Sequence, residues 1–232
     1  MIRKIRTIKT DEEIGRLQKS VQVIEQAVRE SLPIMQPGTT ERELANKMQE
    51  VIGRLGGMPG VLGLAAGPRS AVLVSESDYP LKQGDQVRYD VGCIHNLYWS
   101  DIGRTFSLGE PGKKTKEIYA ALRAGQEAAI HAVKPGVKAC DIYWKAVNTI
   151  REAGIPNYQR PHCGHAIGLE FYDPPNIRPD DQTPLEEGMV FTIETPYYLL
   201  GLGGFQIEDN MVVTRNGVRL LSTLPKDIII PV

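Results

Sequence analysis

The stretch QVRYDVGCIHNLYWSDIGRTF, residues 86–106, contains two runs typical of β-strands, joined by a short polar segment. One aspartate closes the first run, at Asp90, and another opens the second run, at Asp101. A hairpin centred between His95 and Asn96 places these aspartates directly opposite each other, with side chains roughly 4.5–5.5 Å apart. The stretch therefore predicts an antiparallel hairpin that carries a pair of carboxylates.

The stretch VFTIETPYYLLGLGGFQIE, residues 190–208, repeats this arrangement around a glycine-rich turn. Its first strand ends at Glu194, and its last residue is Glu208. Carboxylates held this close repel each other strongly unless cations lie between them. Two matched pairs of acidic residues therefore indicate a cation site in the folded protein.

The two hairpins belong to an internal duplication of the chain. Pro-Gly at 37–38 and at 135–136 precedes apolar residues at matching offsets, and Leu-x-x-Gly at 81–84 and at 185–188 precedes the two hairpins. Each half therefore predicts helices followed by a hairpin whose first strand ends in a carboxylate. Because only two copies exist, we expect one domain over residues 1–232 with pseudo-two-fold symmetry, and not a solenoid.

Capping patterns and apolar spacing locate the helices. Thr10 with Glu13, and Thr40 with Glu43, form capping-box patterns ahead of apolar residues at helical spacing. Two more helices are expected at about 116–133 and 139–153. Strands are expected near 70–75, 86–92, 98–107, 166–172, 189–195, 206–214, 218–221 and 226–230, and the proline-rich segment 173–184 is expected to be a rigid loop beside the site. This order predicts an α+β fold, with helices packed on one face of a mainly antiparallel sheet.

Charge and composition exclude several classes of function. The 27 Lys and Arg against 28 Asp and Glu give a net charge of −1, with no basic excess for nucleic acid or anionic membranes. No apolar run approaches the ~20 residues of a membrane span, and no secretory signal follows the first residues. Three cysteines without metal-like spacing are typical of a reducing compartment. We expect a cytoplasmic protein that binds neither nucleic acid nor membrane.

Oxygen ligands with a single imidazole, here that of His165, suit Mn²⁺, Co²⁺, Fe²⁺ or Zn²⁺. Two such ions that share carboxylates hold a bridging hydroxide at neutral pH and polarise a substrate carbonyl. The ordinary interpretation of any one acidic residue is a solvated strand end or turn. Four acidic residues at mirrored hairpin positions favour a two-metal hydrolytic site over that interpretation.

Four short motifs together resemble one known family, the pita-bread metallopeptidases. They are GHAIGL at 164–169, the Asp90 and Asp101 pair, IETP at 193–196 and IEDN at 207–210. The family includes methionine aminopeptidases, Xaa-Pro aminopeptidases, Xaa-Pro dipeptidases and creatinase. The similarity extends from residue 5 over nearly the whole chain and is closest to the Xaa-Pro group. It implies the pita-bread fold, in which helices pack on a curved, mainly antiparallel sheet.

The resemblance also implies the roles of the site residues. Asp90, Asp101, His165, Glu194 and Glu208 match the five metal ligands of the family. Glu208 would bridge two divalent ions, and Glu194 or Glu208 would handle the proton of the attacking water. Mn²⁺ or Co²⁺ is expected in this site, with Zn²⁺ or Fe²⁺ as alternatives. Family members are often dimers, so a homodimer is expected here as well.

Three positions depart from the family pattern. Val74 and Tyr172 stand where the family has two histidines that are not ligands, and Gln206 stands where it has an arginine. Valine transfers no proton, and tyrosine, with a pKa near 10, does so poorly. Tyr172 either donates a hydrogen bond to the substrate or packs in the core. His162 either contacts the substrate or holds the turn before His165.

Three functions remain open at this point. The first is a dinuclear hydrolase of the Xaa-Pro peptidase type, acting on a small peptide or peptide-like amide. The second, motivated by Val74 and Tyr172, is a hydrolase or lyase acting on a small non-peptide metabolite. The third is a binding module on an inactive peptidase fold, which the complete ligand set disfavours. Larger family members carry a further amino-terminal domain that is absent here, so the chain is a natural short form or a fragment.

Overall fold

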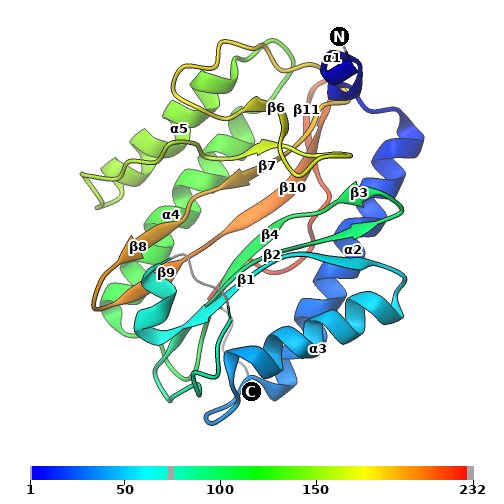
Figure 1. Ribbon diagram of the computed structural model, residues 1–232. Coiled ribbons are helices and arrows are strands. Elements are labelled where there is room, and N and C mark those ends of the chain that lie inside the picture. Colours follow the sequence, from blue (N-terminus) through cyan, green and yellow to red (C-terminus); the bar gives the residue numbers. More distant parts are fainter. Residues whose placement is uncertain (1, 73–75, 229–232) are drawn as a thin grey trace.

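A curved antiparallel sheet organises the computed structural model, which describes residues 2–72 and 76–228. The strands of the described residues are β1 (Met58–Ala66), β2 (Gln86–His95), β3 (Tyr98–Trp99), β4 (Ile102–Ser107), β5 (His165–Ala166), β6 (Asp173–Asn176), β7 (Val190–Glu194), β8 (Tyr197–Leu199), β9 (Gly203–Phe205), β10 (Glu208–Thr214) and β11 (Gly217–Leu220). Among the described residues the main sheet has nine strands, in the order β1-β2-β4-β10-β7-β5-β6 (Figure 1). β3 pairs with β2, β11 pairs with β10, and β8 forms a separate hairpin with β9.

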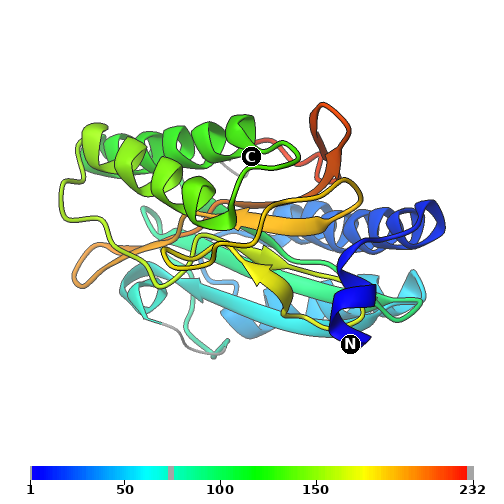
Figure 2. The same cartoon turned by 90° about the horizontal axis from the view of Figure 1, so that it is seen from above.

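Two pairs of long helices cover the two halves of the sheet. The helices are α1 (Ile2–Thr7), α2 (Asp11–Ser31), the 3-10 turn η1 (Leu32–Ile34), α3 (Glu41–Arg54), the 3-10 turn η2 (Gly67–Ala71), α4 (Lys113–Ala132) and α5 (Ala139–Glu152). α2 and α3 share one apolar core with β1, β2 and β4, whereas α4 and α5 share another with β7 and β10. Figure 2 shows α4 and α5 side by side above the strands. None of the helices in the described ranges is long and apolar enough to cross a membrane.

The capping boxes predicted for the first two long helices are confirmed. The side chains of Thr10 and Thr40 accept the backbone N–H of Glu13 and Glu43, and each glutamate bonds back to its threonine N–H. Such reciprocal bonds satisfy amide groups that the first helical turn leaves without partners, and are worth about 1 kcal/mol each.

The internal duplication appears in matching backbone hydrogen bonds. Gly38 donates to the Leu81 carbonyl at 2.9 Å, and Gly136 donates to the Leu185 carbonyl at 2.8 Å. Both glycines have positive φ angles, 96° and 89°, which a residue with a Cβ rarely adopts. In each half these bonds tie the turn before a helix to the segment that leads into a strand with a candidate ligand, Asp90 or Glu194.

Several strand predictions are wrong, for identifiable reasons. β1 was missed because Pro59, Gly60 and Gly63 lower its apparent strand propensity. These glycines permit close contacts instead, since a Cβ on Gly63 would lie 2.9 Å from the Asp90 carbonyl oxygen. The strand predicted at 70–75 is wrong over its described part, where Pro68 starts the 3-10 turn η2.

Other boundaries also differ from the predictions. The strand expected at 166–172 ends at Ala166, and β6 lies within the segment that was predicted to be a loop. No strand covers residues 226–228, and the rest of that predicted strand lies outside the described residues, as does Val74. Helix α1 was not predicted, since six residues are too few for a periodic signal.

Candidate metal centre

Three of the predicted ligands lie in one transverse row across four strands. Asp90 on β2 pairs with Gly103 on β4, Gly103 pairs with Glu208 on β10, and Glu208 pairs with Glu194 on β7. Residues in one row of antiparallel strands direct their side chains to the same face of the sheet. The predicted opposition of Glu194 and Glu208 is confirmed.

The first hairpin differs from its predicted register by two residues. Its turn is centred between Asn96 and Leu97, whose φ angles of 48° and 71° are both positive, as in a two-residue type I′ turn. Asp90 therefore lies opposite Gly103, and the expectation that it faces Asp101 directly is wrong. Asp101 lies diagonally across from Asp90 and reaches the same face of the sheet.

Gly103 allows the side chain of Gln206 to pack over the middle of the row. A Cβ at this position would collide with Cγ of Gln206 and lie 3.0 Å from Cβ of Glu208. The absence of a side chain therefore makes room for Gln206 beside Glu208.

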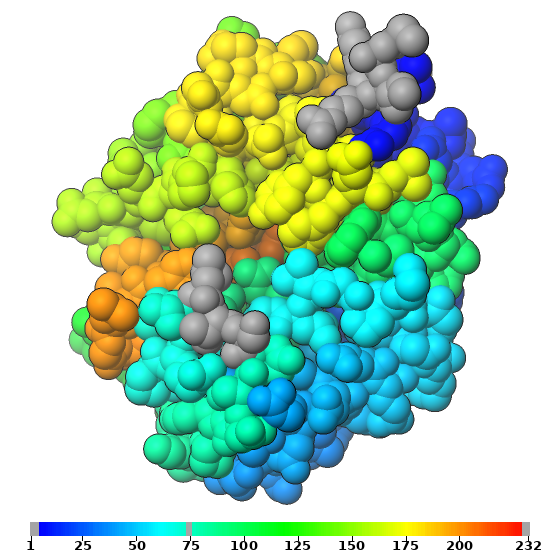
Figure 3. All heavy atoms as spheres, viewed as in Figure 1, coloured from blue at the N-terminus to red at the C-terminus, as the bar shows by residue number. Residues whose placement is uncertain are grey.

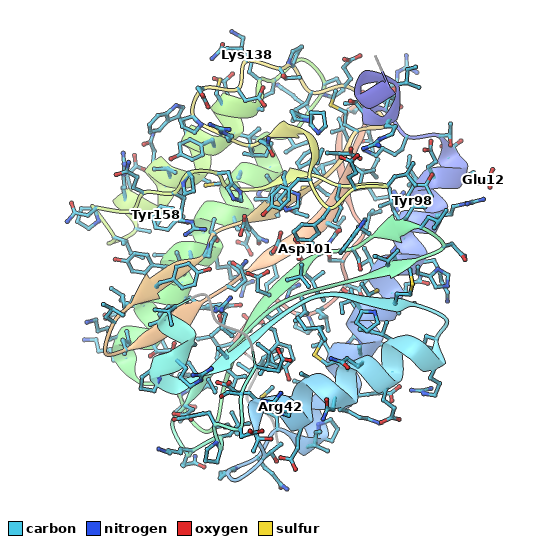
Figure 4. All side chains as sticks on the ribbon, viewed as in Figure 1. Glu12, Arg42, Tyr98, Asp101, Lys138 and Tyr158 are labelled. Atoms are coloured by element: carbon cyan, nitrogen blue, oxygen red, sulfur yellow. The ribbon has the colours of Figure 1, made fainter. Side chains whose placement is uncertain are left out.

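Asp101, His165 and Glu208 form the centre of the cluster. One ligand atom of each lies within 4.8 Å of the others, and all three residues are buried. Nδ1 of His165 donates to the carbonyl oxygen of Ala166 at 3.1 Å, so Nε2 carries the lone pair. This lone pair lies 3.5 Å from Oδ2 of Asp101, an arrangement of two acceptors that favours a cation between them. Figure 4 places Asp101 between the two halves of the sheet.

Burial and mutual repulsion raise the pKa of three carboxyl groups. Burial, followed by the charges of Asp101 and Glu194, raises the pKa of Asp90 to about 7. The same causes hold the pKa of Glu208 well above its ordinary value, and burial raises the pKa of Asp101. Oδ1 of Asp101 and Oε1 of Glu208 are buried without a hydrogen-bond partner among the described residues. These residues therefore fit divalent cations, whose charge would supply the missing partners.

Glu194 is the carboxylate that protein groups stabilise in its charged form. Burial alone would raise its pKa, but His162 and Gln206 lower it overall. Nδ1 of His162 lies 3.0 Å from one oxygen of Glu194, and the Gln206 amide donates to the other at 3.1 Å. The same amide nitrogen is 3.3 Å from Oε2 of Glu208. Gln206 thus links the two glutamates through a neutral donor, in the place where the family resemblance implies an arginine.

Tyr172 lies against the imidazole of His165. The two ring centroids are 4.1 Å apart, and 53% of Tyr172 remains exposed. The alternative that Tyr172 packs in the core is therefore wrong. Phe171 lies 5.3 Å from the same imidazole and 5.2 Å from Trp99, so an aromatic wall borders this side of the site. The surface is hollowed at the centre of this face, between the yellow loop segments and cyan β1 (Figure 3).

Ion pairs from the amino-terminal segment hold the loop that carries Tyr172. Arg6 of α1 binds Glu170 at 3.1 Å on one side of the aromatic pair and Asp173 on the other. The buried amine of Lys9 lies 4.0 Å from the second oxygen of Asp173. The first residues of the chain therefore contribute to the position of the aromatic wall.

A buried ion pair supports the strand that carries Glu208. Nη2 of Arg104 lies 2.6 Å from Oδ1 of Asp209, the residue after Glu208. Arg104 also donates to the backbone carbonyl of Glu208 at 2.7 Å. Gln126 and Lys226 bind the second oxygen of Asp209 at 2.9 and 3.0 Å. β10 is thereby fixed to β4, to α4 and to the segment after β11.

Arg88 is a site residue that sequence reasoning missed. Its Nη1 lies 3.4 Å from Oδ2 of Asp90, and its side chain is 1% exposed. A signal was present in the sequence, because Arg88 stands two residues before Asp90 in an otherwise apolar strand and shares its face.

The sheet, its helix pairs and this cluster of candidate metal ligands define a protein of the pita-bread class. A profile of metallopeptidase family M24 matches residues 15–215, and the chain belongs to this family of metal-dependent hydrolases.

Known relatives agree with this assignment. The chain is 36% identical over 232 residues to an Xaa-Pro dipeptidase of Pyrococcus furiosus, covering 99% of this chain and 67% of the relative. The structure of dipeptidase PepE from Mycobacterium ulcerans is 33% identical with a TM-score of 0.95, covering 99% of this chain and 63% of that one. The prolidase structure from Pyrococcus furiosus is 37% identical with a TM-score of 0.93, covering 97% and 67%. The predicted α+β pita-bread fold is confirmed, and the chain spans about two thirds of the length of these relatives.

Proposed function

We propose that this protein is a dinuclear metal-dependent hydrolase of the Xaa-Pro peptidase type, which cleaves a small peptide or peptide-like amide. Asp90, Asp101, His165, Glu194 and Glu208 would hold two divalent ions, Mn²⁺ or Co²⁺ foremost and Zn²⁺ or Fe²⁺ as alternatives. The observation that carries the proposal is the buried cluster of Asp101, His165 and Glu208, whose ligand atoms lie within 4.8 Å of one another and whose carboxylates each have an oxygen without a hydrogen-bond partner among the described residues. Similarity to Xaa-Pro dipeptidases supports the substrate class.

The proposal extends to the organisation of the protein. Residues 1–232 would form one catalytic domain, supported by a sheet to which both halves contribute. A cytoplasmic location is supported by three cysteines that are all free. A homodimer is supported by the family resemblance.

When bound, the ions lower the pKa of a water molecule and polarise the scissile carbonyl. The residues of the chain would position the reactants and move the proton. Glu194, whose pKa is lowered by His162 and Gln206, is ionised at neutral pH and would accept the proton of the attacking water. Glu208 lies between Gly103 and Glu194 in the row, a position that supports a bridging role.

Tyr172 would donate a hydrogen bond to the substrate. Burial and the surrounding carboxylates raise its pKa, so the hydroxyl stays protonated at neutral pH. Tyr172 is half-exposed, and its ring lies against His165. His162 and Val74 remain predicted substrate contacts.

The Tyr172→Phe substitution tests this role. We expect kcat/KM to fall about 10- to 100-fold, because one hydrogen bond in the transition state is lost. Metal affinity should be unchanged, since the ring that stacks on His165 is retained. Tyr119→Phe, which removes a buried hydroxyl without a partner in the described structure, is the matched control. Kinetics of the Tyr172 variant equal to those of wild type would exclude the role.

The function itself is tested by metal removal and substrate choice. Protein stripped by a chelator is given back Mn²⁺, Co²⁺, Zn²⁺ or Fe²⁺ and assayed with Xaa-Pro dipeptides, other dipeptides and small non-peptide amides. We expect hydrolysis of Xaa-Pro dipeptides to rise at least 100-fold over the chelated protein with Mn²⁺ or Co²⁺, because loss of the ions removes both the nucleophile and the electrophile. Failure to bind metal stoichiometrically would exclude the proposal.

An alternative function is favoured by Tyr172, which stands where peptidases of this family carry a histidine. The same metal centre would then act on a small non-peptide metabolite. Tight metal binding combined with turnover of non-peptide amides alone would support this alternative, and rapid turnover of Xaa-Pro dipeptides would exclude it.

A further inference from the structure

The guanidinium of Arg88 is buried directly behind the metal ligand Asp90. Its Nη1 approaches Oδ2 of Asp90 at 3.4 Å, while Nε and Nη2 donate to the carbonyl oxygens of Ser70 and Val72 at 3.3 and 3.5 Å. These carbonyls belong to the 3-10 turn η2 and the residue after it, not to β2. The guanidinium is therefore fixed from three directions, and Asp90 is its only carboxylate partner among the described residues.

The ring of Tyr198 lies next to this buried charge. The Arg88 guanidinium lies 5.4 Å from the Tyr198 ring centroid, within the range of a cation–π contact. Burial raises the pKa of Tyr198 to about 12, so its hydroxyl stays neutral and leaves the charge of Arg88 uncompensated from this side. Arg160 lies at the same distance from the same ring and adds a second cation at this edge. Charges shielded from water act more strongly on their neighbours than exposed ones.

Arg88 adds a positive charge to a proposed centre whose other charges cancel. Four carboxylates cancel the charge of two divalent ions, and His165 binds through a neutral ring when Nδ1 donates to Ala166. Gln206, between the two glutamates, adds no charge. Arg88 therefore leaves the loaded centre with an excess positive charge, because its ion partner Asp90 is already counted among the ligands.

We propose that Arg88 is a positioning residue that orients Asp90 and gives the metal-loaded centre a net positive charge, which favours a small anionic ligand at the metal ions. The inference rests on the proposed dinuclear centre. Gln206 stands where the family resemblance implies an arginine. The positive charge that is missing at position 206 would instead come from Arg88 on β2. The ligands favoured in this way are hydroxide and small carboxylate-like or pseudohalide anions.

The charge acts in opposite directions on the two kinds of ligand. It repels incoming divalent cations and attracts an anion that binds to them. Removing it should therefore leave Mn²⁺ binding as tight as in wild type or tighter, and should weaken the anion. A residue that only maintains the fold would weaken both, because both depend on the same ligand geometry.

The test compares wild type with Arg88→Met and Arg88→Lys. Mn²⁺ affinity is measured by calorimetry on metal-free protein, and azide affinity is measured from the visible spectrum of Co²⁺-loaded protein. For Arg88→Met we expect azide to bind about tenfold more weakly and Mn²⁺ at least as tightly as in wild type. Arg88→Lys, which keeps the charge, should stay within about threefold of wild type on both measurements. Lys134→Met removes one exposed charge from the turn between α4 and α5 and should change neither.

Each other outcome is informative. A parallel loss of Mn²⁺ and azide affinity in Arg88→Met, or no change in azide affinity, would overturn the inference while the proposed function stands. A wild-type protein that binds no Mn²⁺ would overturn both. If Arg88→Met does not fold, Arg88→Gln takes its place, because it retains a donor for the Ser70 carbonyl.

Discussion

Replacing Glu208 with glutamine is expected to abolish metal-dependent hydrolysis and, at the same time, to stabilise the metal-free protein. Activity should fall at least 1,000-fold, because Glu208 stands at the centre of the ligand row and would bridge both ions. Metal-free Glu208→Gln should have a higher free energy of unfolding than wild type at pH 7.5. The reason is that a buried carboxyl group whose pKa is raised well above its ordinary value opposes folding when it ionises.

The two effects are measured separately. Steady-state kinetics in Mn²⁺ or Co²⁺ report the loss of activity, and denaturant unfolding in chelator reports the stability. Glu152→Gln, at an exposed position near the end of α5, removes the same charge and should change neither quantity. A Glu208→Gln enzyme that kept its activity would favour the binding-module interpretation, and a less stable metal-free variant would contradict the electrostatic account.

The metal-free protein is expected to lose stability as the pH rises from about 4 to about 7, through the titration of Asp90. The pKa of Asp90 is raised to about 7 in the folded chain, first by burial and then by Asp101 and Glu194, whereas an unfolded aspartate has a pKa of about 3.9. The folded state therefore binds this proton more tightly than the unfolded state. The stabilisation that comes from protonated Asp90 is complete below pH 4 and is lost as the pH rises through 7. We expect a loss of about 4 kcal/mol, since each tenfold difference in proton affinity between the folded and unfolded states is worth about 1.4 kcal/mol.

The contribution of Asp90 is isolated by comparison with Asp90→Asn. Groups such as Asp209, whose pKa is lowered chiefly by Arg104 against the effect of burial, have the opposite pH dependence and cancel in this comparison. Denaturant unfolding in chelator between pH 4.5 and 8 should show a steeper loss for wild type than for the variant. Saturating Mn²⁺ should raise the stability of wild type at pH 7.5 more than that of the variant, because the variant lacks one of the proposed ligands. Parallel stability curves for the two metal-free proteins would contradict this account.

The sequence predicted the parts of the fold that depend on local chemistry. Capping boxes at Thr10 and Thr40 define helix starts, because their hydrogen bonds lie within one turn of chain. The second hairpin was predicted in register because its glycines mark the turn, and Glu194 and Glu208 pair as expected. The first hairpin turns at Asn96 and Leu97, which both have positive φ angles. Leucine rarely adopts such angles, so the sequence did not indicate a turn at this position and the predicted register was wrong.

The glycines show most clearly what sequence reasoning lacked. Gly60 and Gly63 made β1 look like a loop, yet a Cβ on Gly60 would meet the ring of Trp99 and the carbonyl of Gly92. Only the folded chain brings these neighbours together, so the need for glycine arises from contacts distant in sequence. The same applies to Gly103, whose missing side chain makes room for that of Gln206.

By itself, the sequence determined the α+β class, the duplication, the positions of the long helices and the identity of the candidate ligands. These follow from periodicity, capping chemistry and repeated motifs, which are properties of neighbouring residues. Only the tertiary structure decided that Asp90 faces Gly103, that Tyr172 stacks on His165, and that Arg88 stands behind Asp90. These relations depend on strand register and on distances between remote segments, and a shift of a single residue moves every side chain of a strand to the other face.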